Sequence, residues 1–535
     1  MSADDGEWWK SSVVYQVYPR SFADSDGDGI GDLAGLISRL DHLARLGVDV
    51  VWLSPVYPSP QVDNGYDISD YQGIDPVFGD LATFDRLVAE LHSRGMKLVI
   101  DIVVNHTSDQ HPWFQESRSA KDNPKRDWYW WREEPTNWRS FFSGPTWTRD
   151  EATGEYYLHL FAPAQPDLNW ENPDVRRAVA EMMRWWLDRG VDGFRMDVIN
   201  LVSKDPALPK ALDDGDGLGD GSAFYTSGPR IHQYLAELRA RVLEGHTGEV
   251  LFIGEMPGVT IEHAALFTDP ARAEVDLVFQ FEHVSLGHQG DKFLAGPLAP
   301  GELVDCLERW QRGLADVGWN SSYLGNHDQP RMVSRFGDDS AEHRVASAKA
   351  LATVLLLQRG TPFIYQGDEL GMTNSVWARP DDFRDVESLN YWDANGHRDP
   401  VGVLQGLRAM GRDNARTPMQ WDSGRHAGFT TGAPWLPANP NHVEINAAAQ
   451  YGDPGSVFEH YRGLIALRHT SRAISHGTHR QVPQEDPAPY CFVREAGTER
   501  VEVWANLSSR PTTVRLESGQ RRTLAPWESG FTLGG

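Results

Sequence analysis

Acidic, basic and imidazole side chains gather at the ends of several short apolar runs of the chain. One run ends in Arg195 and Asp197, another ends in Glu255, and Asp328 follows a third. Three carboxyl groups beside an arginine could divide acid–base work, one ionised as a nucleophile and one protonated as a proton donor. This division of labour between two carboxyl groups is the chemistry of glycoside hydrolysis.

The spacing around Asp197 predicts how its ionisation is controlled. Gly193, Arg195 and Asp197 alternate along one run, so in a β-strand they share a face. An adjacent guanidinium favours the ionised carboxylate, and we expect it to lower the pKa of Asp197. Glu255 has less polar neighbours in the sequence, so partial burial should raise its pKa and keep a proton ready. A purely structural ion pair between Arg195 and Asp197 is the alternative.

Eight short β-type runs must position these residues, and helical stretches separate the runs. The runs are 13–18, 48–54, 97–104, 191–199, 249–255, 275–281, 321–326 and 361–366. The stretches 33–47 and 81–95 have apolar residues at helical spacing and end in glycine, a common helix C-cap. Strands alternating with helices indicate parallel βαβ units, and eight of them predict an α/β fold, the (β/α)8 TIM barrel. Active sites of such barrels lie at the carboxyl ends of the strands, where these polar residues would meet.

Two departures from this rhythm predict further domains. Residues 105–172 separate the third and fourth strands, and a structureless loop of that length is rare, so we expect an inserted subdomain there. After a helical stretch at 456–469 the pattern changes to short β-type runs, which predicts a C-terminal antiparallel β domain over 473–535. The catalytic barrel would then comprise 1–104 and 173–472.

Composition excludes several classes of partner. The 535 residues carry a formal net charge of -26, which repels phosphate backbones and anionic membranes, so we expect neither nucleic acid nor a membrane as partner. The N-terminus lacks the apolar segment of a secretory signal, and no apolar run approaches roughly 20 residues. Only two cysteines occur, too few for a disulfide framework. These features predict a cytoplasmic protein.

Four segments occur in order at the ends of the predicted strands: DIVVNH (101–106), GFRMD (193–197), GE (254–255) and NHD (326–328). They resemble the four characteristic segments of the α-amylase family of retaining glycoside hydrolases. QPDLN (165–169) is similar to a further segment of that family. WWKSSVVYQVYPRSF, NGYDISDY and GRDNARTPMQW resemble the oligo-1,6-glucosidase and α-glucosidase branch. The resemblance covers nearly the whole chain.

The resemblance implies a catalytic role for each of the three carboxyl groups. Asp197 would be the nucleophile, Glu255 the general acid and base, and Asp328 the carboxylate that orients the sugar hydroxyls and stabilises the transition state. The reaction would be a double displacement through a glucosyl ester of Asp197, with net retention. We expect the Asp197 and Glu255 carboxyl groups about 5–5.5 Å apart, the separation of retaining enzymes.

The same resemblance implies how the sugar is held. Tyr66 would be a stacking platform, and Asp67 and Arg412 would pair across the end of the cleft and grip the terminal hydroxyls. Three further residues would hydrogen-bond the sugar: His106, Arg195 and His327. An ion pair that closes the cleft admits only a terminal glucose, which predicts an exo-acting enzyme on short oligosaccharides.

Val198 predicts the linkage. In this branch a valine after the nucleophile resembles enzymes that cut α-1,6 bonds, and alanine or threonine resembles α-1,4 cleavers; an ordinary β-branched strand residue is the alternative. An α-glucosyltransferase, with a sugar or alcohol acceptor in place of water, is a second possible function. A non-catalytic carbohydrate-binding or transporter accessory chain is a third, which the three retained carboxyl groups disfavour.

One acidic loop predicts a structural calcium ion, and no organic cofactor is expected. DSDGDGIGD (24–32) follows the spacing of an EF-hand loop, although Gly35 stands where the final glutamate belongs. The branch resemblance agrees with calcium at this loop, and the alternative is a solvated acidic turn. The expected ligands are Asp24, Asp26, Asp28, the Ile30 carbonyl and Asp32. The similar string DGDGLGD (214–220) is predicted to be a solvated loop.

Overall fold

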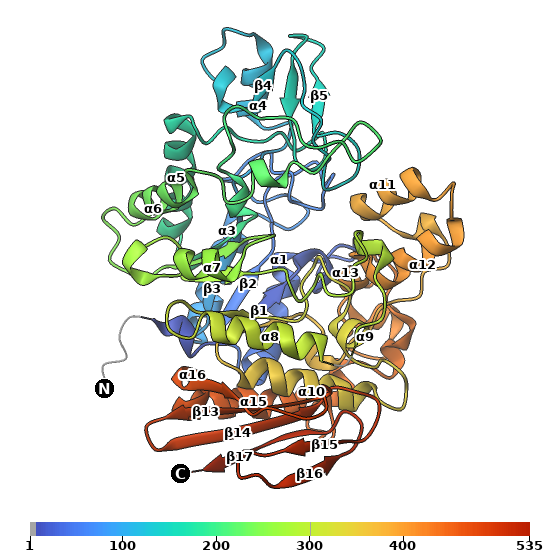
Figure 1. The fold of residues 1–535 in the computed structure, drawn as a ribbon. Helices are drawn as coiled ribbons and strands as arrows, with labels where there is room; N and C mark the ends of the chain where they lie inside the picture. Colours follow the sequence, from blue (N-terminus) through green and yellow to red (C-terminus); the bar gives the residue numbers. More distant parts are fainter. Residues whose placement is uncertain (1–6, 300, 535) are drawn as a thin grey trace.

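The structure is a computed structural model that describes residues 7–299 and 301–534. A barrel of strands and helices occupies the middle of the molecule (Figure 1). A small sheet formed after the third barrel strand lies at one end of it, and antiparallel strands from the end of the chain lie at the other (Figure 1).

Eight parallel strands form the barrel in the order β10–β11–β1–β2–β3–β7–β8–β9. Their bounds are β1 (Val14–Val17), β2 (Val50–Leu53), β3 (Lys97–Val103), β7 (Gly193–Asp197), β8 (Leu251–Glu255), β9 (Leu277–Phe279), β10 (Ser321–Ser322) and β11 (Thr361–Tyr365). A parallel bridge between Val278 and Asn320 joins the two edges of this sheet. The eight predicted strands and the TIM barrel are confirmed, and the strands are somewhat shorter than predicted.

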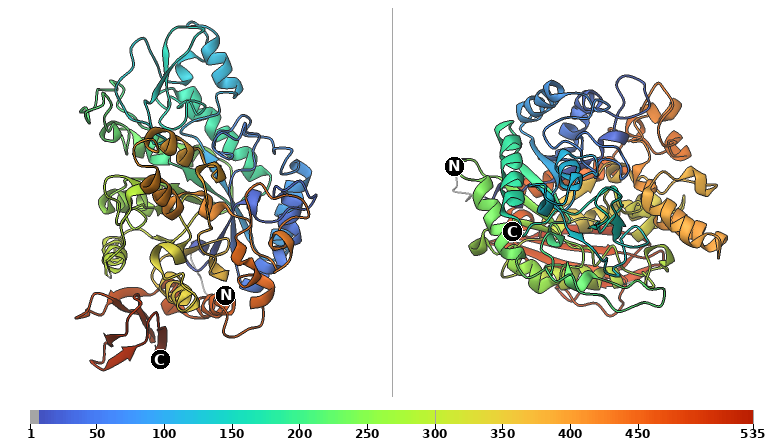
Figure 2. Two further views of the ribbon diagram at one scale, coloured as in Figure 1. Left: turned by 90° about the vertical axis from the view of Figure 1, so that its right-hand side faces the viewer. Right: turned by 90° about the horizontal axis from the view of Figure 1, so that it is seen from above.

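Helices surround the strands, as the view from above shows (Figure 2). The predicted helix at 81–95 is α3 (Leu81–Ser93), whereas the stretch 33–47 forms two helices, α1 (Leu33–Ser38) and α2 (Leu40–Leu46), because the backbone of Arg39 leaves the helical region (φ -112°, ψ 6°). The remaining helices of the barrel region are α5 (Pro173–Asp188), α6 (Ile231–Val242), α7 (Ile261–Phe267), α8 (Glu302–Gly313), α9 (Met332–Phe336), α10 (Arg344–Leu357), α11 (Val386–Asn395), α12 (Pro400–Met410), α13 (Asp413–Arg416), α14 (Ala447–Gln450), α15 (Val457–Thr470) and α16 (Arg472–His476).

The interior of the barrel changes from apolar to polar along the strands. Its lower part is a buried cluster that includes Val99 of β3 and Ile253 of β8. Because side chains alternate along a strand, the next residues on the same face are Asp101 and Glu255. The apolar layer therefore forms the base on which the carboxyl groups of neighbouring strands meet.

The excursion after β3 forms a small antiparallel sheet that sits over the barrel mouth. It contains α4 (Pro112–Ser119) and three strands, β4 (Trp131–Arg132), β5 (Trp147–Arg149) and β6 (Tyr156–Leu158), in the order β4–β6–β5. Lys204, buried after β7, pairs with Asp167 of the excursion at 2.9 Å and donates to Asn105 Oδ1 at 3.0 Å. This buried ion pair connects the excursion to the carboxyl ends of β3 and β7.

The end of the chain forms two antiparallel sheets. One contains β12 (Thr478–Gln481), β13 (Pro489–Ala496), β14 (Glu499–Asn506) and β17 (Ser529–Gly534), and the other β15 (Thr512–Arg515) and β16 (Arg521–Leu524). The short β-type runs of this region, PYCFVRE (489–495), RVEVWANL (500–507) and TTVRLE (512–517), correspond to β13, β14 and β15. The other three strands are largely exposed or half-exposed, and none contains an unbroken apolar run. Within residues 7–299 and 301–534, no helix has the length and apolarity that crossing a bilayer requires.

Candidate active site

Arg195 lies at the centre of the polar layer and contacts carboxyl groups of three adjacent strands. Its Nη1 donates to Asp101 Oδ1 at 2.7 Å and to Asp197 Oδ1 at 2.6 Å, and its Nη2 pairs with Glu255 Oε1. The guanidinium is buried and lies over the ring of Trp52, 5.1 Å from its centroid. One cation therefore holds the side chains of β3, β7 and β8 together.

Glu255 and Asp197 form a closely coupled acid pair. The two carboxyl groups lie within hydrogen-bonding reach of each other, and burial raises the pKa of both. The facing Glu255 carboxylate raises the pKa of Asp197 further, well above its ordinary value. The pair therefore retains a proton more readily than isolated carboxyl groups do, because two facing carboxylates in a buried site repel each other.

Arg195 does lower the pKa of Asp197, as predicted, but the net pKa is raised all the same. Its single positive charge is divided among Asp101, Asp197 and Glu255, which is too little to offset burial and the repulsion between the two facing carboxylates. The predicted rise in the pKa of Glu255 is confirmed, and burial is its largest cause.

Val198 has an unusual backbone conformation directly after β7. Its φ of 37° and ψ of 39° lie in the left-handed region, which a β-branched residue rarely adopts. Its N–H donates to Glu255 Oε2 at 3.0 Å, and its side chain lines the cavity described below. Strain of this kind costs on the order of 1–3 kcal/mol and commonly marks a functional site, here one that orients Glu255.

Asp328 lies in a more cationic setting than the acid pair. Its Oδ1 accepts hydrogen bonds from Arg412 Nη1 at 3.2 Å and Arg416 Nη2 at 2.9 Å. Although burial opposes it, His327, Arg412 and Arg416 hold the pKa of Asp328 well below its ordinary value. Asp328 is therefore ionised at a pH at which the acid pair still holds its proton.

The two histidines of the predicted site are neutral hydrogen-bonding groups. Burial lowers the pKa of His327 to about 3 and that of His106 to about 4. Gln16 Nε2 lies 2.8 Å from His327 Nδ1 and donates to it, so the ring proton belongs on Nε2, 3.3 Å from Asp328 Oδ2. The rings of His327 and Tyr66 are stacked, with centroids 5.1 Å apart.

The predicted ion pair between Asp67 and Arg412 is wrong, because Asp63 takes that place. Arg412 Nη2 donates to Asp63 Oδ1 at 3.0 Å. Asp67 is fully buried and accepts hydrogen bonds from Ser59 Oγ and from the N–H groups of Val62 and Asp63. Asp67 therefore shapes the turn that carries Asp63, and Asp63 faces the cavity.

A cavity of about 250 Å³ brings most of these residues together. The predicted site residues that line it are Tyr66, His106, Asp197, Val198, Glu255, Asp328 and Arg412. Three predicted site residues do not line the cavity: Arg195, His327 and Asp67. Arg195 contacts the lining residue Asp197, and His327 stacks on the lining residue Tyr66. The catalytic and binding residues, predicted from six separate stretches of sequence, therefore converge on one pocket with Arg412 and Asp63 at one side.

Sequence reasoning missed several residues of this pocket. Asp63 lines it, as do the ion pair of Lys292 with Glu387 (2.7 Å) and a wall of phenylalanines, Phe141, Phe142 and Phe161. Arg416 contacts Asp328 without lining the cavity. It could have been found, because it lies four residues after Arg412 in the segment GRDNARTPMQW and so on the same side of a helix. The phenylalanines carry no comparable signal, since they come from the excursion and read as core residues.

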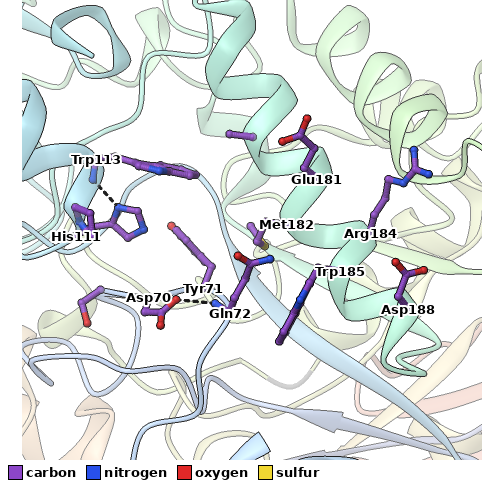
Figure 3. Close-up of a pocket in the computed structure, with 13 residues that line it drawn as sticks. Asp70, Tyr71, Gln72, His111, Trp113, Glu181, Met182, Arg184, Trp185 and Asp188 are labelled. Carbon is purple, nitrogen blue, oxygen red and sulfur yellow. Dashed lines mark hydrogen bonds between the residues drawn. The ribbon is translucent and has the colours of Figure 1, made fainter. Parts of the chain in front are cut away.

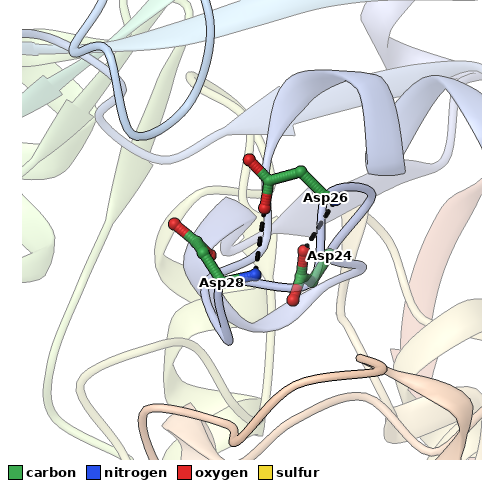
Figure 4. A group of neighbouring side chains, drawn as sticks. All are labelled: Asp24, Asp26 and Asp28. Atoms are coloured by element: carbon green, nitrogen blue, oxygen red, sulfur yellow. Dashed lines mark hydrogen bonds between the residues drawn. The ribbon is translucent and has the colours of Figure 1, made fainter.

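The acidic loop 24–32 brings three carboxylates together (Figure 4). Ligand oxygens of Asp24, Asp26 and Asp28 lie within 4.8 Å of one another, and no other such group occurs among residues 7–299 and 301–534. Asp32 stands apart from this group, because its oxygens accept hydrogen bonds from Ser25 and from the first turn of α1. In the second acidic loop Arg139 pairs with Asp216 at 2.8 Å.

Comparisons with known proteins agree on one family. The family model described as the alpha amylase catalytic domain matches residues 16–477. The chain is 53% identical to the oligo-1,6-glucosidase of Parageobacillus thermoglucosidasius, over 95% of this chain and 92% of that protein. It is 46% identical to the trehalose-6-phosphate hydrolase of Bacillus subtilis, over 100% and 95%. The solved trehalulose synthase of Pseudomonas mesoacidophila MX-45 matches with a TM-score of 0.94 and 43% identity, covering 98% of this chain and 99% of that chain.

The contrast between Asp63 and Asp67 predicts different effects on stability. Asp67→Asn replaces an acceptor of three buried hydrogen bonds and should cost about 1–3 kcal/mol, visible as a lower midpoint of thermal unfolding. Asp63→Asn leaves Arg412 in contact with Asp328 and Asp385 and removes a carboxylate whose pKa burial raises to about 7. Its midpoint should stay close to that of the unchanged protein. Equal losses in both variants would contradict this assignment.

Proposed function

The chain belongs to the α-amylase family of retaining glycoside hydrolases, in the oligo-1,6-glucosidase and α-glucosidase branch, and we propose that it releases terminal glucose from short α-glucosides. One observation carries the proposal: Asp197, Glu255 and Asp328 line a single small cavity with Arg412 at its side. At about 250 Å³ the cavity is smaller than the roughly 300–1,000 Å³ of pockets for larger ligands, which suits one terminal sugar.

The arrangement of the acid pair supports a double displacement. Asp197 attacks the anomeric carbon while Glu255 gives its proton to the departing glycosidic oxygen, and a glucosyl ester of Asp197 forms. Glu255, now ionised, then takes a proton from water, which attacks the ester and releases glucose with net retention. Contact of both carboxyl groups with Arg195 fits the separation of about 5–5.5 Å in retaining enzymes better than the roughly 6.5–9.5 Å of inverting ones.

The protonation states of the site suit this mechanism. Since burial and mutual repulsion favour one proton on the acid pair, one carboxyl group is available to attack and the other to donate. The Val198 N–H and Arg195 orient Glu255. Asp328 stays ionised, so it can accept hydrogen bonds from sugar hydroxyls and stabilise the positive charge that develops at the transition state.

The charged group around Arg412 supports exo action. Arg412 contacts Asp63 and Asp328 at once, and the ring of Phe142 lies 5.0 Å from its guanidinium carbon. A glucan chain could not pass this group without separating buried charges, which is costly. The sugar therefore enters as a chain end, and its terminal hydroxyls meet Asp63, Asp328 and Arg412.

An α-1,6 preference is the second part of the proposal. Relatives that are 50–53% identical are named oligo-1,6-glucosidases. Val198 stands beside both catalytic carboxyl groups in the cavity wall, where its branched side chain limits the space for the acceptor sugar. The alternative is a preference for α-1,4 bonds, and a comparison of isomaltose with maltose distinguishes the two.

Transfer of glucose to another sugar is the competing activity. Structures at 42–43% identity include a trehalulose synthase and an isomaltulose synthase, the latter in complex with sucrose. Transfer would use the same ester of Asp197, with a sugar hydroxyl in place of water, so the acceptor side of the cavity decides the outcome. Lining residues outside the predicted set, the Lys292–Glu387 ion pair and the apolar Phe281 and Val284, could also affect this choice.

We also propose a structural calcium ion at the loop 24–32. The carboxylates of Asp24, Asp26 and Asp28 and the Ile30 carbonyl would supply the hard oxygen ligands that calcium prefers. Thr430 donates to Asp24, so an ion here would also strengthen the contact between this loop and a segment distant in sequence. The ion would act on stability, because the loop residues are absent from the lining of the catalytic cavity.

We propose that the protein works in the cytoplasm on neutral oligosaccharides. Both cysteines, Cys306 and Cys491, are free and buried, which suits a reducing compartment. The net charge of -26 does not disfavour a neutral substrate.

Two substitutions test the mechanism. Glu255→Gln should lower kcat/KM for isomaltose by about 10²–10⁴-fold, because no proton reaches the leaving oxygen, but should affect α-glucosyl fluoride far less, since fluoride leaves without one. Asp197→Asn should abolish both reactions. If isomaltose and the fluoride lose activity equally in Glu255→Gln, that residue is not the acid.

The same pair predicts a shift in pH dependence. The facing Glu255 carboxylate raises the pKa of Asp197, which must be ionised to attack. In Glu255→Gln the acid limb of kcat/KM for α-glucosyl fluoride should therefore move to lower pH. An unmoved or raised limb would show that Glu255 does not control the ionisation of Asp197.

Val198→Ala tests the linkage preference. Removing the branched side chain beside the acceptor site should lower the ratio of kcat/KM for isomaltose to that for maltose by several-fold. The change is at most about 1–3 kcal/mol, the usual effect of one or two methyl groups in a pocket. The measurement is this ratio in the unchanged protein and in Val198→Ala. An unchanged ratio would show that Val198 does not set the linkage preference.

Chelation tests the calcium proposal. Dialysis against a chelator should lower the midpoint of thermal unfolding, and added calcium should restore it. A double variant, Asp26→Asn with Asp28→Asn, should no longer respond, whereas Asp214→Asn with Asp216→Asn in the second acidic loop should respond fully. The same midpoint with chelator and with calcium in the unchanged protein would refute the ion.

A further inference from the structure

A second cavity, of about 770 Å³, lies on the flank of the barrel (Figure 3). It is bounded by residues 69–72, by the start of α4 and by α5, and it shares no lining residue with the catalytic cavity. Trp113 of α4 and Trp185 of α5 stand on opposite sides of it (Figure 3).

Both tryptophan rings are fixed by neighbours and remain partly exposed. Trp113 packs against His111 and Trp128, with centroids 4.6 and 4.9 Å away. Arg189 covers the ring of Trp185 at 4.7 Å. In the described part of the chain neither indole N–H has a hydrogen-bond partner. Two preset aromatic faces with free donors suit a ligand that has apolar faces and polar edges.

The polar groups around the tryptophans are mainly acceptors. Asp70, Glu181 and Asp188 line the cavity, and among residues 7–299 and 301–534 none of them has an ion-pair partner. The amide of Gln72 is exposed. Arg184 is the cavity's cation, and its guanidinium points to Glu244 at 3.5 Å. Such a lining repels anions and accepts hydrogen bonds from hydroxyl groups.

His111 adds a donor. Its side chain is buried, and its Nδ1 accepts a hydrogen bond from the backbone N–H of Trp113 at 3.1 Å, so its ring proton belongs on Nε2. Burial lowers the pKa of His111 to about 3, so it brings no positive charge. A divalent cation is disfavoured as the ligand, because the three carboxylates do not converge as those of the loop 24–32 do.

We propose that this flank cavity is a second, non-catalytic binding site for neutral α-glucans, with Trp113 and Trp185 as stacking surfaces. The acceptors and the His111 N–H hold the sugar hydroxyls. The site goes beyond the proposed hydrolysis, since its residues take no part in the reaction.

One short segment, residues 66–71, contributes to both the flank cavity and the catalytic cavity. Tyr71 lines the flank cavity, and its hydroxyl donates to the carbonyl oxygen of His106 at 3.0 Å. The side chain of His106 lines the catalytic cavity, and so does Tyr66, five residues before Tyr71. A glucan held on the flank would therefore stay near the pocket that receives its chain end.

Native electrophoresis in gels that contain dextran or soluble starch tests this proposal. The protein carries Glu255→Gln to prevent digestion, and glucose in the gel occupies the catalytic pocket. The polysaccharide should retard this protein. Trp185→Ala should weaken the apparent affinity about tenfold, the upper range for one aromatic contact, and Gln72→Ala should weaken it less.

Trp8→Ala is the matched control, because Trp8 is also half-buried and also lies under a cation, Lys97 at 4.8 Å, but outside this cavity. It should be retarded like the parent. Three results would overturn the proposal. They are no retardation of the parent, retardation that glucose abolishes, and retardation that Trp185→Ala and Gln72→Ala leave unchanged. None of these outcomes bears on hydrolysis, which glucose release from isomaltose by the unchanged protein reports separately.

Discussion

The contact of Arg195 with three carboxyl groups is the interaction on which the rest of the site depends. A buried guanidinium is stable only where carboxylates and a ring face replace the water it has lost, and here Asp101, Asp197 and Glu255 do so with Trp52 beneath. Losing one partner of a buried pair typically costs about 3–5 kcal/mol. The contact therefore requires β3, β7 and β8 to keep their register, and that register brings the acid pair together.

The acid pair and Asp328 differ in how many arginines contact them. Arg195 alone serves the acid pair, so the pair retains a proton. Arg412 and Arg416 both contact Asp328, which therefore loses its proton. Identical side-chain types thus receive opposite protonation states from the local balance of charge rather than from their positions on the barrel.

The sequence predicted the barrel and the three carboxyl groups because both leave local patterns: apolar runs that end in polar residues, within family segments. It could not predict the pKa of Asp197, since that depends on how many carboxylates share one arginine in three dimensions. Nor could it separate Asp63 from Asp67, because both flank Tyr66 within one turn and only the path of that turn decides which reaches Arg412. Strands β12, β16 and β17 were missed because they are largely exposed or half-exposed and none contains an unbroken apolar run.

The buried pair of Lys204 and Asp167 has a consequence for folding. An uncompensated lysine is costly to bury, so Lys204 can enter the interior only together with Asp167 of the excursion. Docking of the excursion and burial of Lys204 after β7 are therefore coupled. The excursion also contributes the wall of phenylalanines, so the pocket is complete only where this ion pair has formed.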